Sequence, residues 1–377
     1  MTNKNCIETI SNADNLLHSL TRLHKASGWK YTTQKLEINK FKEIYSLQKQ
    51  VRNNQYSQKK GAEFRICEQG HLRLIKSLRP EDTLVQHSLC DFVLIPKLKK
   101  YLIHDNGASQ KGKGISFTRK RFEQHVHQFY RKYGRHGYIL KIDFRKYFDN
   151  IEHKKLIETL KKHIYDEALI NFIQKLIDYY KIDVSYSDDP NIIDQVFNSL
   201  EYQKISDRKK TGERFMEKSL GIGAPISQIF GIYFPTRIDT YIKTVKGCKY
   251  YDVYMDDRIV IHQSKIYLKK LLKEIEKIAV ELGIHINKKK TQIIKLTHGF
   301  TFLKTKYILT DTGKLIRKIP RDVVVRQRRK MKHIAELVIK GERPLYLFIE
   351  QYKSWKGDKK RYNAYYTLLH LDILYNK

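Results

Sequence analysis

Both ends of the chain are predicted to be helical. Residues 1–60 are predicted to be helical because apolar positions three and four residues apart form a stripe, made by Leu16, Leu17, Leu20 and Leu23. No residue pattern in this segment indicates chemistry, so an accessory helical layer is expected. The last stretch, about 321–377, is also predicted to be helical, and it is strongly basic at 327–332.

Strand patterns are confined to the middle of the chain, where they alternate with helices. Short strands are predicted at 64–66 and 72–75, and a helix is predicted after Asp82 as its N-cap. The clearest strand, 138–142, ends at Asp143. Helices then follow at about 153–164, 166–180, 227–244 and 267–282, with an irregular insertion or hairpin at 181–218 and short strands at 292–296, 300–303 and 307–309.

The segment from Tyr250 to His262 is predicted to be a hairpin with Asp256 and Asp257 together at its tip. Two carboxylates about 4 Å apart repel each other by roughly 4 kcal/mol at an effective dielectric constant near 20. Such a turn either points its carboxylates into water or uses them to bind a divalent cation.

The composition indicates a polyanionic partner. Lysine and arginine total 74 against 40 aspartate and glutamate, a formal charge of +34 that is spread along the chain. Nucleic acid is the first candidate, and the 26 tyrosines suit base stacking as well as a core. No apolar run is long enough for a membrane span and no secretory signal is evident. The four scattered cysteines are expected to be buried and reduced in a cytoplasmic protein.

A basic glycine-rich stretch covers 105–114. Three glycines and two lysines within eight residues let backbone amides and ammonium groups approach a phosphate closely. The stretch is not a Walker loop, because the Gly-Lys-Ser/Thr ending and the preceding strand are both missing. On spacing alone, a flexible basic loop without a ligand explains it equally well.

Asp143 and the Asp256-Asp257 pair would converge if their strands were neighbours in one sheet. Three such carboxylates suit a pair of Mg²⁺ ions, which prefer oxygen ligands and support phosphoryl transfer.

Five motifs in order make residues 61 to about 310 resemble a reverse transcriptase. The matching segments are 143–151 for the first palm motif, 221–228 for the second, Tyr254-Met255-Asp256-Asp257 for the third, 282–291 for the fourth and 299–303 for the primer-grip hairpin. The resemblance implies an α+β fold, a right-hand polymerase with a small antiparallel palm sheet packed on helices. It implies an N-terminal helical extension at 1–60, fingers at 61–136, a palm at 137–310 with an insertion at 181–218, and a thumb at 311–377.

The resemblance also implies the metal site. Asp143 and Asp256 would be the principal ligands of two Mg²⁺ ions, with Mn²⁺ as the alternative, and Asp257 would lie close by. Phe144 is expected to contribute to both the metal site and the substrate site. Lys290 would protonate the leaving pyrophosphate, although Lys288 and Lys289 beside it leave that choice open.

Substrate contacts follow from the same alignment. Phe148 would exclude a 2′-hydroxyl and so select dNTPs, and Arg73 would meet the triphosphate. Ile222 and Gln228 would also bind substrate, and Phe302 with Leu303 would support the primer end. The alternatives are a core role for the phenylalanines and Leu303, and a plain surface charge for Arg73.

One departure bears on the subtype. The second motif reads Gly221-Ile222-Gly223 where group II intron and retroviral enzymes carry Pro-Gln-Gly, and it resembles diversity-generating and bacterial defence-associated enzymes instead. Nothing resembles a ribonuclease H, an integrase or an HNH endonuclease.

The expected function is therefore an RNA-directed DNA polymerase that copies a structured noncoding RNA, in antiphage defence. The expected partners are that RNA as template or scaffold, the DNA product and dNTPs, with no membrane; a homo-oligomer with RNA is left open. The alternatives are the enzyme of a diversity-generating retroelement, and an RNA-binding protein that keeps the palm fold without catalysis.

Overall fold

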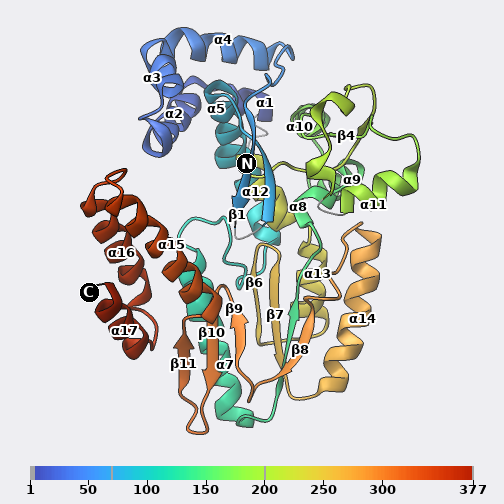
Figure 1. Ribbon diagram of the computed structural model, residues 1–377. Helices are drawn as coiled ribbons and strands as arrows, with labels where there is room; N and C mark the ends of the chain where they lie inside the picture. Colours follow the sequence, from blue (N-terminus) through green and yellow to red (C-terminus); the bar gives the residue numbers. More distant parts are fainter. Residues whose placement is uncertain (1–4, 69–70, 199–200, 376–377) are drawn as a thin grey trace.

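The computed structural model describes residues 5–68, 71–198 and 201–375 (Figure 1). Helices dominate, and every strand pair within these residues is antiparallel. The largest sheet has four strands in the order β6 (Tyr251–Tyr254), β7 (Asp257–His262), β3 (Tyr138–Ile142) and β8 (Gln292–Lys295). A three-stranded sheet has the order β11 (Leu315–Lys318), β10 (Thr305–Leu309) and β9 (Phe300–Phe302).

The N-terminal helices form the layer that the apolar stripe predicted. Asn12 caps one of them by accepting hydrogen bonds from the amides of Asp14 and Asn15. Leu16, Leu20 and Leu23 are buried, and this layer packs on α5 (Pro80–Leu89). The four helices are α1 (Cys6–Ile10), α2 (Ala13–Ser27), α3 (Tyr31–Ile38) and α4 (Lys40–Arg52).

The next segment contains the hairpin of β1 (Glu63–Glu68) and β2 (His71–Lys76) and then α5. The predicted N-cap was wrong: Arg79 holds that position and Pro80 begins the helix. Asp82 is instead buried, where it accepts a hydrogen bond from the Tyr56 hydroxyl at 2.6 Å. The chain continues through η1 (Cys90–Leu94), α6 (Ile95–Leu98), η2 (Lys99–Tyr101) and α7 (Ile115–Tyr133).

Strands β3, β6 and β7 of the central sheet are largely buried, and successive residues of a strand point to opposite faces of the sheet. Leu140 of β3 and Val260 of β7 belong to the main core with the inner face of α14 (Lys265–Glu281). Their neighbours Ile139 and Ile259 belong to a second core with α7 and the three-stranded sheet. The four strands are β3 (Tyr138–Ile142), β6 (Tyr251–Tyr254), β7 (Asp257–His262) and β8 (Gln292–Lys295).

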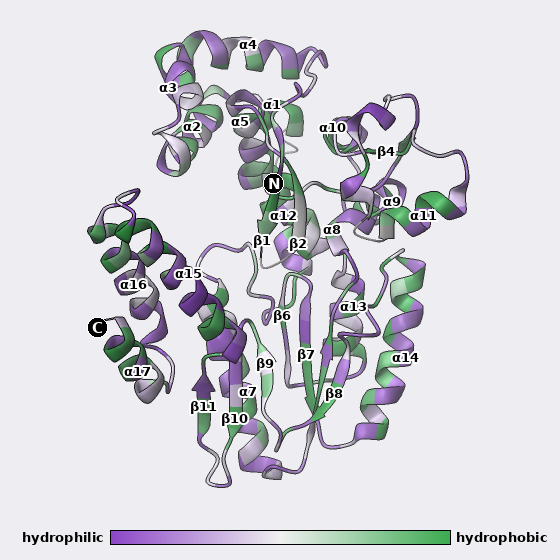
Figure 2. Ribbon diagram, viewed as in Figure 1, coloured by the Kyte–Doolittle hydropathy of each residue, from purple (hydrophilic) through white to green (hydrophobic). Residues whose placement is uncertain are grey.

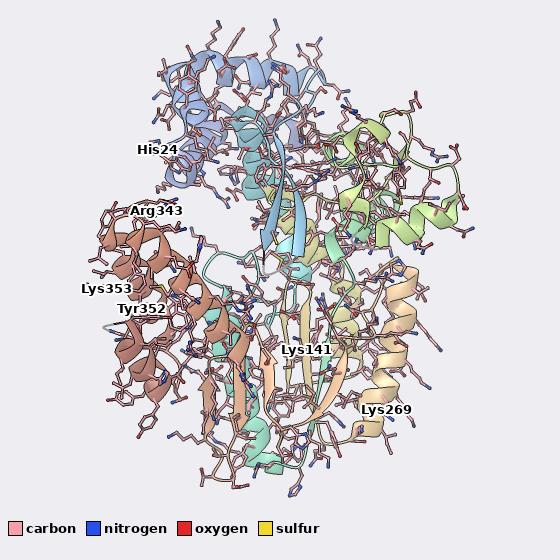
Figure 3. All side chains as sticks on the ribbon, in the orientation of Figure 1. His24, Lys141, Lys269, Arg343, Tyr352 and Lys353 are labelled. Carbon is pink, nitrogen blue, oxygen red and sulfur yellow. The ribbon has the colours of Figure 1, made fainter. Side chains whose placement is uncertain are left out.

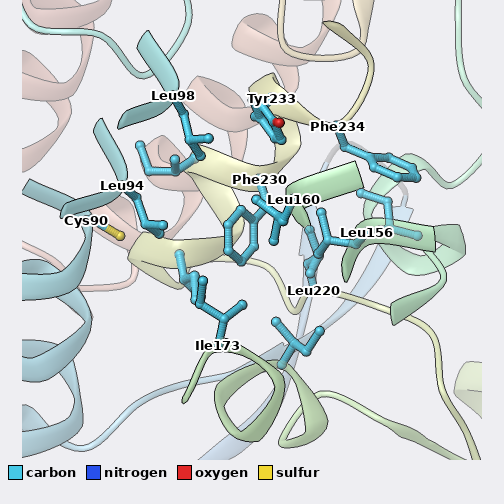
Figure 4. Close-up of a cluster of buried hydrophobic side chains, with 14 of the residues drawn as sticks. Cys90, Leu94, Leu98, Leu156, Leu160, Ile173, Leu220, Phe230, Tyr233 and Phe234 are labelled. Carbon is cyan, nitrogen blue, oxygen red and sulfur yellow. The ribbon is translucent and has the colours of Figure 1, made fainter. Parts of the chain in front are cut away.

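The segment between β3 and β6 is mostly helical and contributes most to the main core. Figure 4 shows Phe230 of α12 (Pro225–Tyr233) among Leu156, Leu160 and Ile173. The elements before α12 are α8 (Tyr147–Asn150), α9 (His153–Lys161), α10 (Glu167–Asp178), β4 (Ile182–Asp183), α11 (Pro190–Asn198), η3 (Glu201–Lys204), η4 (Asp207–Lys209) and β5 (Phe215–Met216).

Two predictions for this segment were wrong. The insertion at 181–218 contains the helix α11, although β4 and β5 at its two ends do pair in antiparallel fashion. The single helix predicted at 227–244 is three pieces, α12, α13 (Thr236–Thr240) and η5 (Tyr241–Val245). Pro235 lies between the first two and cannot donate a backbone hydrogen bond.

The C-terminal part adds a small sheet and three helices. Its strands are β9 (Phe300–Phe302), β10 (Thr305–Leu309) and β11 (Leu315–Lys318), the last of which the sequence did not reveal. The helices α15 (Arg321–Ile339), α16 (Leu345–Lys359) and α17 (Tyr365–Tyr375) lie to one side of this sheet in Figure 1.

Three cysteines, Cys6, Cys90 and Cys248, are buried and free as expected, but Cys67 on β1 is exposed. Within the described ranges, no helix combines the length and the apolar character that crossing a membrane requires. Figure 2 shows hydrophilic residues along each of the long helices α7, α14, α15 and α16.

Candidate active site

The predicted hairpin is present, and we call residues 251–262 the catalytic hairpin. Tyr254 pairs with Asp257, so the two-residue turn is Met255-Asp256. The prediction that both carboxylates lie in the turn was therefore wrong by one position, because Asp257 is the first residue of β7. Met255 has φ of 54°, which is unusual for a residue other than glycine and sets the direction of the turn.

Asp143 lies next to this hairpin because β3 pairs with β7. Ile142 is opposite Arg258 in that register, so the following residue, Asp143, continues toward Asp257. The backbone at Asp143 is held by the segment 287–291. The amide of Asp143 donates to the Thr291 hydroxyl at 3.2 Å, and its carbonyl accepts from the Asn287 amide at 2.8 Å. The first, third and fourth motifs thus meet at one end of the central sheet.

The three carboxylates influence one another electrostatically. Burial raises the pKa of Asp143 above its ordinary value; Lys290 lowers it and Asp256 raises it further. Burial also raises the pKa of Asp257 to about 6, and Asp256 and Asp143 add to the rise while Lys141 opposes it. Lys141 Nζ lies 3.8 Å from Asp257 Oδ1, and Figure 3 labels Lys141 on the central sheet. This is a site of concentrated negative charge made only of oxygen ligands, which suits a hard divalent cation.

The raised pKa of Asp257 predicts a pH-dependent stability. Between its ordinary value near 3.8 and about 6, the folded protein holds more protons than the unfolded chain. The free energy of unfolding therefore falls as pH rises through that window. Asp257→Asn is expected to raise Tm at pH 8, in metal-free buffer, by roughly 2–4 °C, and to leave Tm at pH 3.5 unchanged. Thermal unfolding at both pH values tests this, and an equal change at both would contradict it.

Lys290 and Lys289 lie with Asp143 along a groove of about 850 Å³. The groove is bordered by 299–301 and by Arg321 at the start of α15. Of the three candidate lysines, Lys290 is the one whose charge acts on Asp143. Lys290 therefore lies close enough to act electrostatically on Asp143, and its role as a proton donor stays a prediction.

Ile222 and Gln228 line a second cavity, of about 1030 Å³, that reaches Tyr254 of the catalytic hairpin. Lys111 and Lys113 of the basic glycine-rich stretch line it too. The stretch thus forms part of the wall of the cavity that includes Tyr254. The ammonium group of Lys113 also donates to the carbonyls of His104 at 2.7 Å and Asn106 at 3.1 Å. Arg73 lies opposite Ile66 on β2, but its side chain is outside the described part of the structure.

Phe148 is half-buried, and its ring packs against Gly231 of α12. A Cβ on Gly231 would lie 2.8 Å from Phe148 Cε1, so the helix needs glycine at this position for the ring to lie where it does. Partial exposure is compatible with a substrate contact.

Three predicted contacts differ in the structure. The side chains of Phe302 and Leu303 are buried in the second core, at 0% and 7% exposure, so they shape the primer-grip hairpin and do not present a surface to a primer. The carbonyl of Leu303 accepts a hydrogen bond from Arg119 at 2.7 Å. The ring of Phe144 is also buried, at 3% exposure, and carries no ligand atom, which leaves only its backbone for the metal site.

A buried ion network that the sequence did not reveal lies behind the catalytic hairpin. His125 Nδ1 is 2.8 Å from Asp252 Oδ2, and these two residues with Asp105 form the one group of three within the described ranges whose ligand atoms all lie within 4.8 Å. Asp105 already binds Arg121 and Lys243, each at 2.8 Å. Burial alone would raise the Asp105 pKa, but these two cations outweigh it and bring the pKa to about 2.

Two cations on one carboxylate disfavour a metal ion there, so this network is structural. It also holds the basic glycine-rich stretch against the hairpin. The Val253 amide donates to the Asp105 carbonyl and the Gly107 amide donates to the Val253 carbonyl, both at 3.1 Å.

Comparisons with known proteins agree with this geometry. Residues 57–307 match the family described as "Reverse transcriptase (RNA-dependent DNA polymerase)". No curated protein matches the chain. Solved structures that resemble it include a Candida albicans telomerase in complex with a TWJ fragment of telomeric RNA (12% identity, TM-score 0.44, covering 69% of this chain and 46% of that one). An apo telomerase from Candida tropicalis matches with 17% identity, a TM-score of 0.40 and coverage of 70% and 49%.

The chain spans about half the length of these telomerase chains, and similarity this low carries no argument about substrates. The family match covers more than half of the chain and includes all five motifs. The predicted fold, a right-hand polymerase of helices and small antiparallel sheets, is confirmed, while its division into fingers, palm and thumb stays a prediction. This chain belongs to the reverse transcriptase family.

Proposed function

We propose that this protein is an RNA-directed DNA polymerase that adds dNTPs to a primer 3′ end on an RNA template. One observation carries the proposal: the pairing of β3 with β7 brings Asp143 to the hairpin that bears Asp256 and Asp257. Asp256 raises the pKa values of both Asp143 and Asp257, which supports this proximity.

Asp143 and Asp256 would bind two Mg²⁺ ions, with Asp257 beside them and the Phe144 backbone available. When bound, such a pair activates the primer 3′-hydroxyl and stabilises the leaving oxygen. The remaining roles fall to the protein. Lys290, whose charge lowers the pKa of Asp143, would donate a proton to the leaving pyrophosphate. Lys111 and Lys113 line the cavity beside Tyr254 and would hold nucleotide or template phosphates.

The template would be a structured noncoding RNA, and the setting bacterial antiphage defence in the cytoplasm. The charge of +34 supports an extended RNA contact. The Gly221-Ile222-Gly223 triplet supports the defence-associated subtype; two of its residues, Ile222 and Gly223, line the same cavity as Gln228. Sequencing the nucleic acids that co-purify with the protein and lengthen when dNTPs are added would identify the template and the primer.

The same triplet favours one second candidate, the polymerase of a diversity-generating retroelement. A template repeat and an accessory gene beside this gene would support that reading. An RNA-binding protein without catalysis would show salt-dependent RNA binding but no incorporation.

The proposed activity is tested by primer extension on an RNA template with Mg²⁺. Labelled dNTPs should be incorporated, and NTPs should be used far less. Failure to extend any RNA, DNA or self-primed template, including the co-purified RNA, would contradict the proposal.

A further inference from the structure

Arg258, the residue after the paired aspartates, is completely buried, with an exposure of 0%. Its guanidinium reaches back to the catalytic turn, where Nη1 donates to the carbonyls of Met255 at 3.1 Å and Asp256 at 3.4 Å. Nε donates to Asp239 Oδ1 at 2.9 Å. A single side chain therefore holds the turn that presents Asp256.

The anchor of this arginine is itself buried and fixed. Asp239 on α13 is 1% exposed and also accepts a hydrogen bond from the Tyr251 hydroxyl at 2.6 Å. The guanidinium carbon lies 4.4 Å from the ring centroid of Phe144, the residue after Asp143. Arg258 thus links α13, the turn of the catalytic hairpin and the segment that carries Asp143, and its partner Asp239 also binds Tyr251 at the start of the hairpin.

Stability alone is a poor explanation for this pair. Removing two charges from water costs free energy that their attraction repays only in part, and neutral or apolar replacements of buried pairs are often neutral or stabilising. The planar fork of arginine, in contrast, fixes several acceptors at once, which lysine does not do. The acceptors here include the carbonyl of Met255, whose φ of 54° is unfavourable without outside support.

We propose that Arg258, anchored by Asp239, is a positioning residue that fixes the catalytic turn so that Asp256 faces Asp143. The expected effect of Arg258 on kcat rests on the proposed polymerase function, whereas its expected effect on the structure of the turn does not. The Asp105 network holds Asp252 of β6 through His125, and Asp239 holds the preceding residue, Tyr251. The two networks therefore hold adjacent residues of the same strand.

The test uses the double variant Asp239→Asn/Arg258→Gln, which removes both charges and so avoids leaving one buried charge unpaired. Arg258→Lys keeps the charge without the fork. The matched control is Glu123→Gln/Arg317→Gln, which neutralises an ion pair between α7 and β11 in which Arg317 donates two hydrogen bonds to the Glu123 carboxylate. Amide hydrogen exchange is measured without metal, and kcat and primer–template Kd are measured with Mg²⁺.

In the double variant, exchange at 254–258 should rise about tenfold or more while exchange at 138–142 and Tm stay near wild type. The kcat should fall about 10- to 100-fold, since small displacements of reacting groups have such effects, with an unchanged Kd. For Arg258→Lys, the exchange rate at 254–258 and kcat should both lie between those of the wild type and the double variant. The control should leave exchange at 254–258 unchanged.

Wild-type exchange and kcat in the double variant would overturn the proposal, and so would faster exchange throughout the protein, which would indicate a role in folding only. If the wild type shows no polymerase activity, the proposed function fails, but the exchange measurement still decides whether Arg258 positions the turn.

Discussion

Asp256→Ala is expected to lower kcat for dNTP incorporation by about 10³-fold or more, because a divalent cation supplies several kcal/mol of transition-state stabilisation and this variant removes one of its principal ligands. Asp143→Ala should lower kcat by a similar factor, since both carboxylates belong to the same proposed metal site. The Kd for primer–template should change little, because phosphate contacts elsewhere on this basic chain dominate binding. Single-nucleotide incorporation on an RNA template measures both constants.

The control for this prediction is an exposed carboxylate in the insertion at 181–218. Asp188→Ala removes an exposed carboxylate that forms an ion pair with Arg214, and it should retain wild-type kcat. A second control is Lys269→Ala on α14, which Figure 3 shows away from Lys141. Wild-type kcat in Asp256→Ala or Asp143→Ala would leave the proposed polymerase without its metal site.

Phe148→Ala is expected to reduce the preference for dNTPs over NTPs by roughly 10²-fold, by analogy with pockets that discriminate through shape. The ring is half-buried beside Gly231, and its removal would leave room for a 2′-hydroxyl. The ratio of kcat/KM for a matched dNTP and NTP pair is the measurement. The change should come from faster NTP use, with dNTP use reduced far less.

Gly231→Ala gives an opposite perturbation at the same place. The added Cβ would lie 2.8 Å from Phe148 Cε1, so the ring must move. We expect slower incorporation of both nucleotides and no gain in NTP use. If Phe148→Ala lowers Tm and keeps its full selectivity, Phe148 is a core residue and the proposed selection mechanism is wrong.

The sequence predicted the elements that local pattern determines. A short, mostly apolar run located β3 at 138–142, with Asp143 directly after it. Period-3.6 stripes located α2 and α14. Asp143, Asp256 and Lys290 came together because the motif order of a known family implied the strand pairing, which periodicity alone does not specify.

The features that the sequence did not predict depend on contacts between residues far apart in the chain and on which face of an element is packed against the core. Arg258 and Asp239 are nineteen positions apart, and His125 and Asp252 are 127 apart, so no local pattern links the members of either pair. Phe302 and Leu303 could equally face a primer or the core, and the packing of α7 on β9 decided for the core. Pro235 divided a helix whose apolar pattern continued past it.

The most direct test of the central claim is to locate Mn²⁺ by anomalous diffraction in crystals of the protein with an RNA–DNA duplex and a non-reactive dNTP analogue. The account predicts Mn²⁺ at about 2.1 Å from carboxylate oxygens of Asp143 and Asp256. Mn²⁺ found only at the Asp105, His125 and Asp252 group, or no ion near Asp143 with the analogue bound, would contradict it.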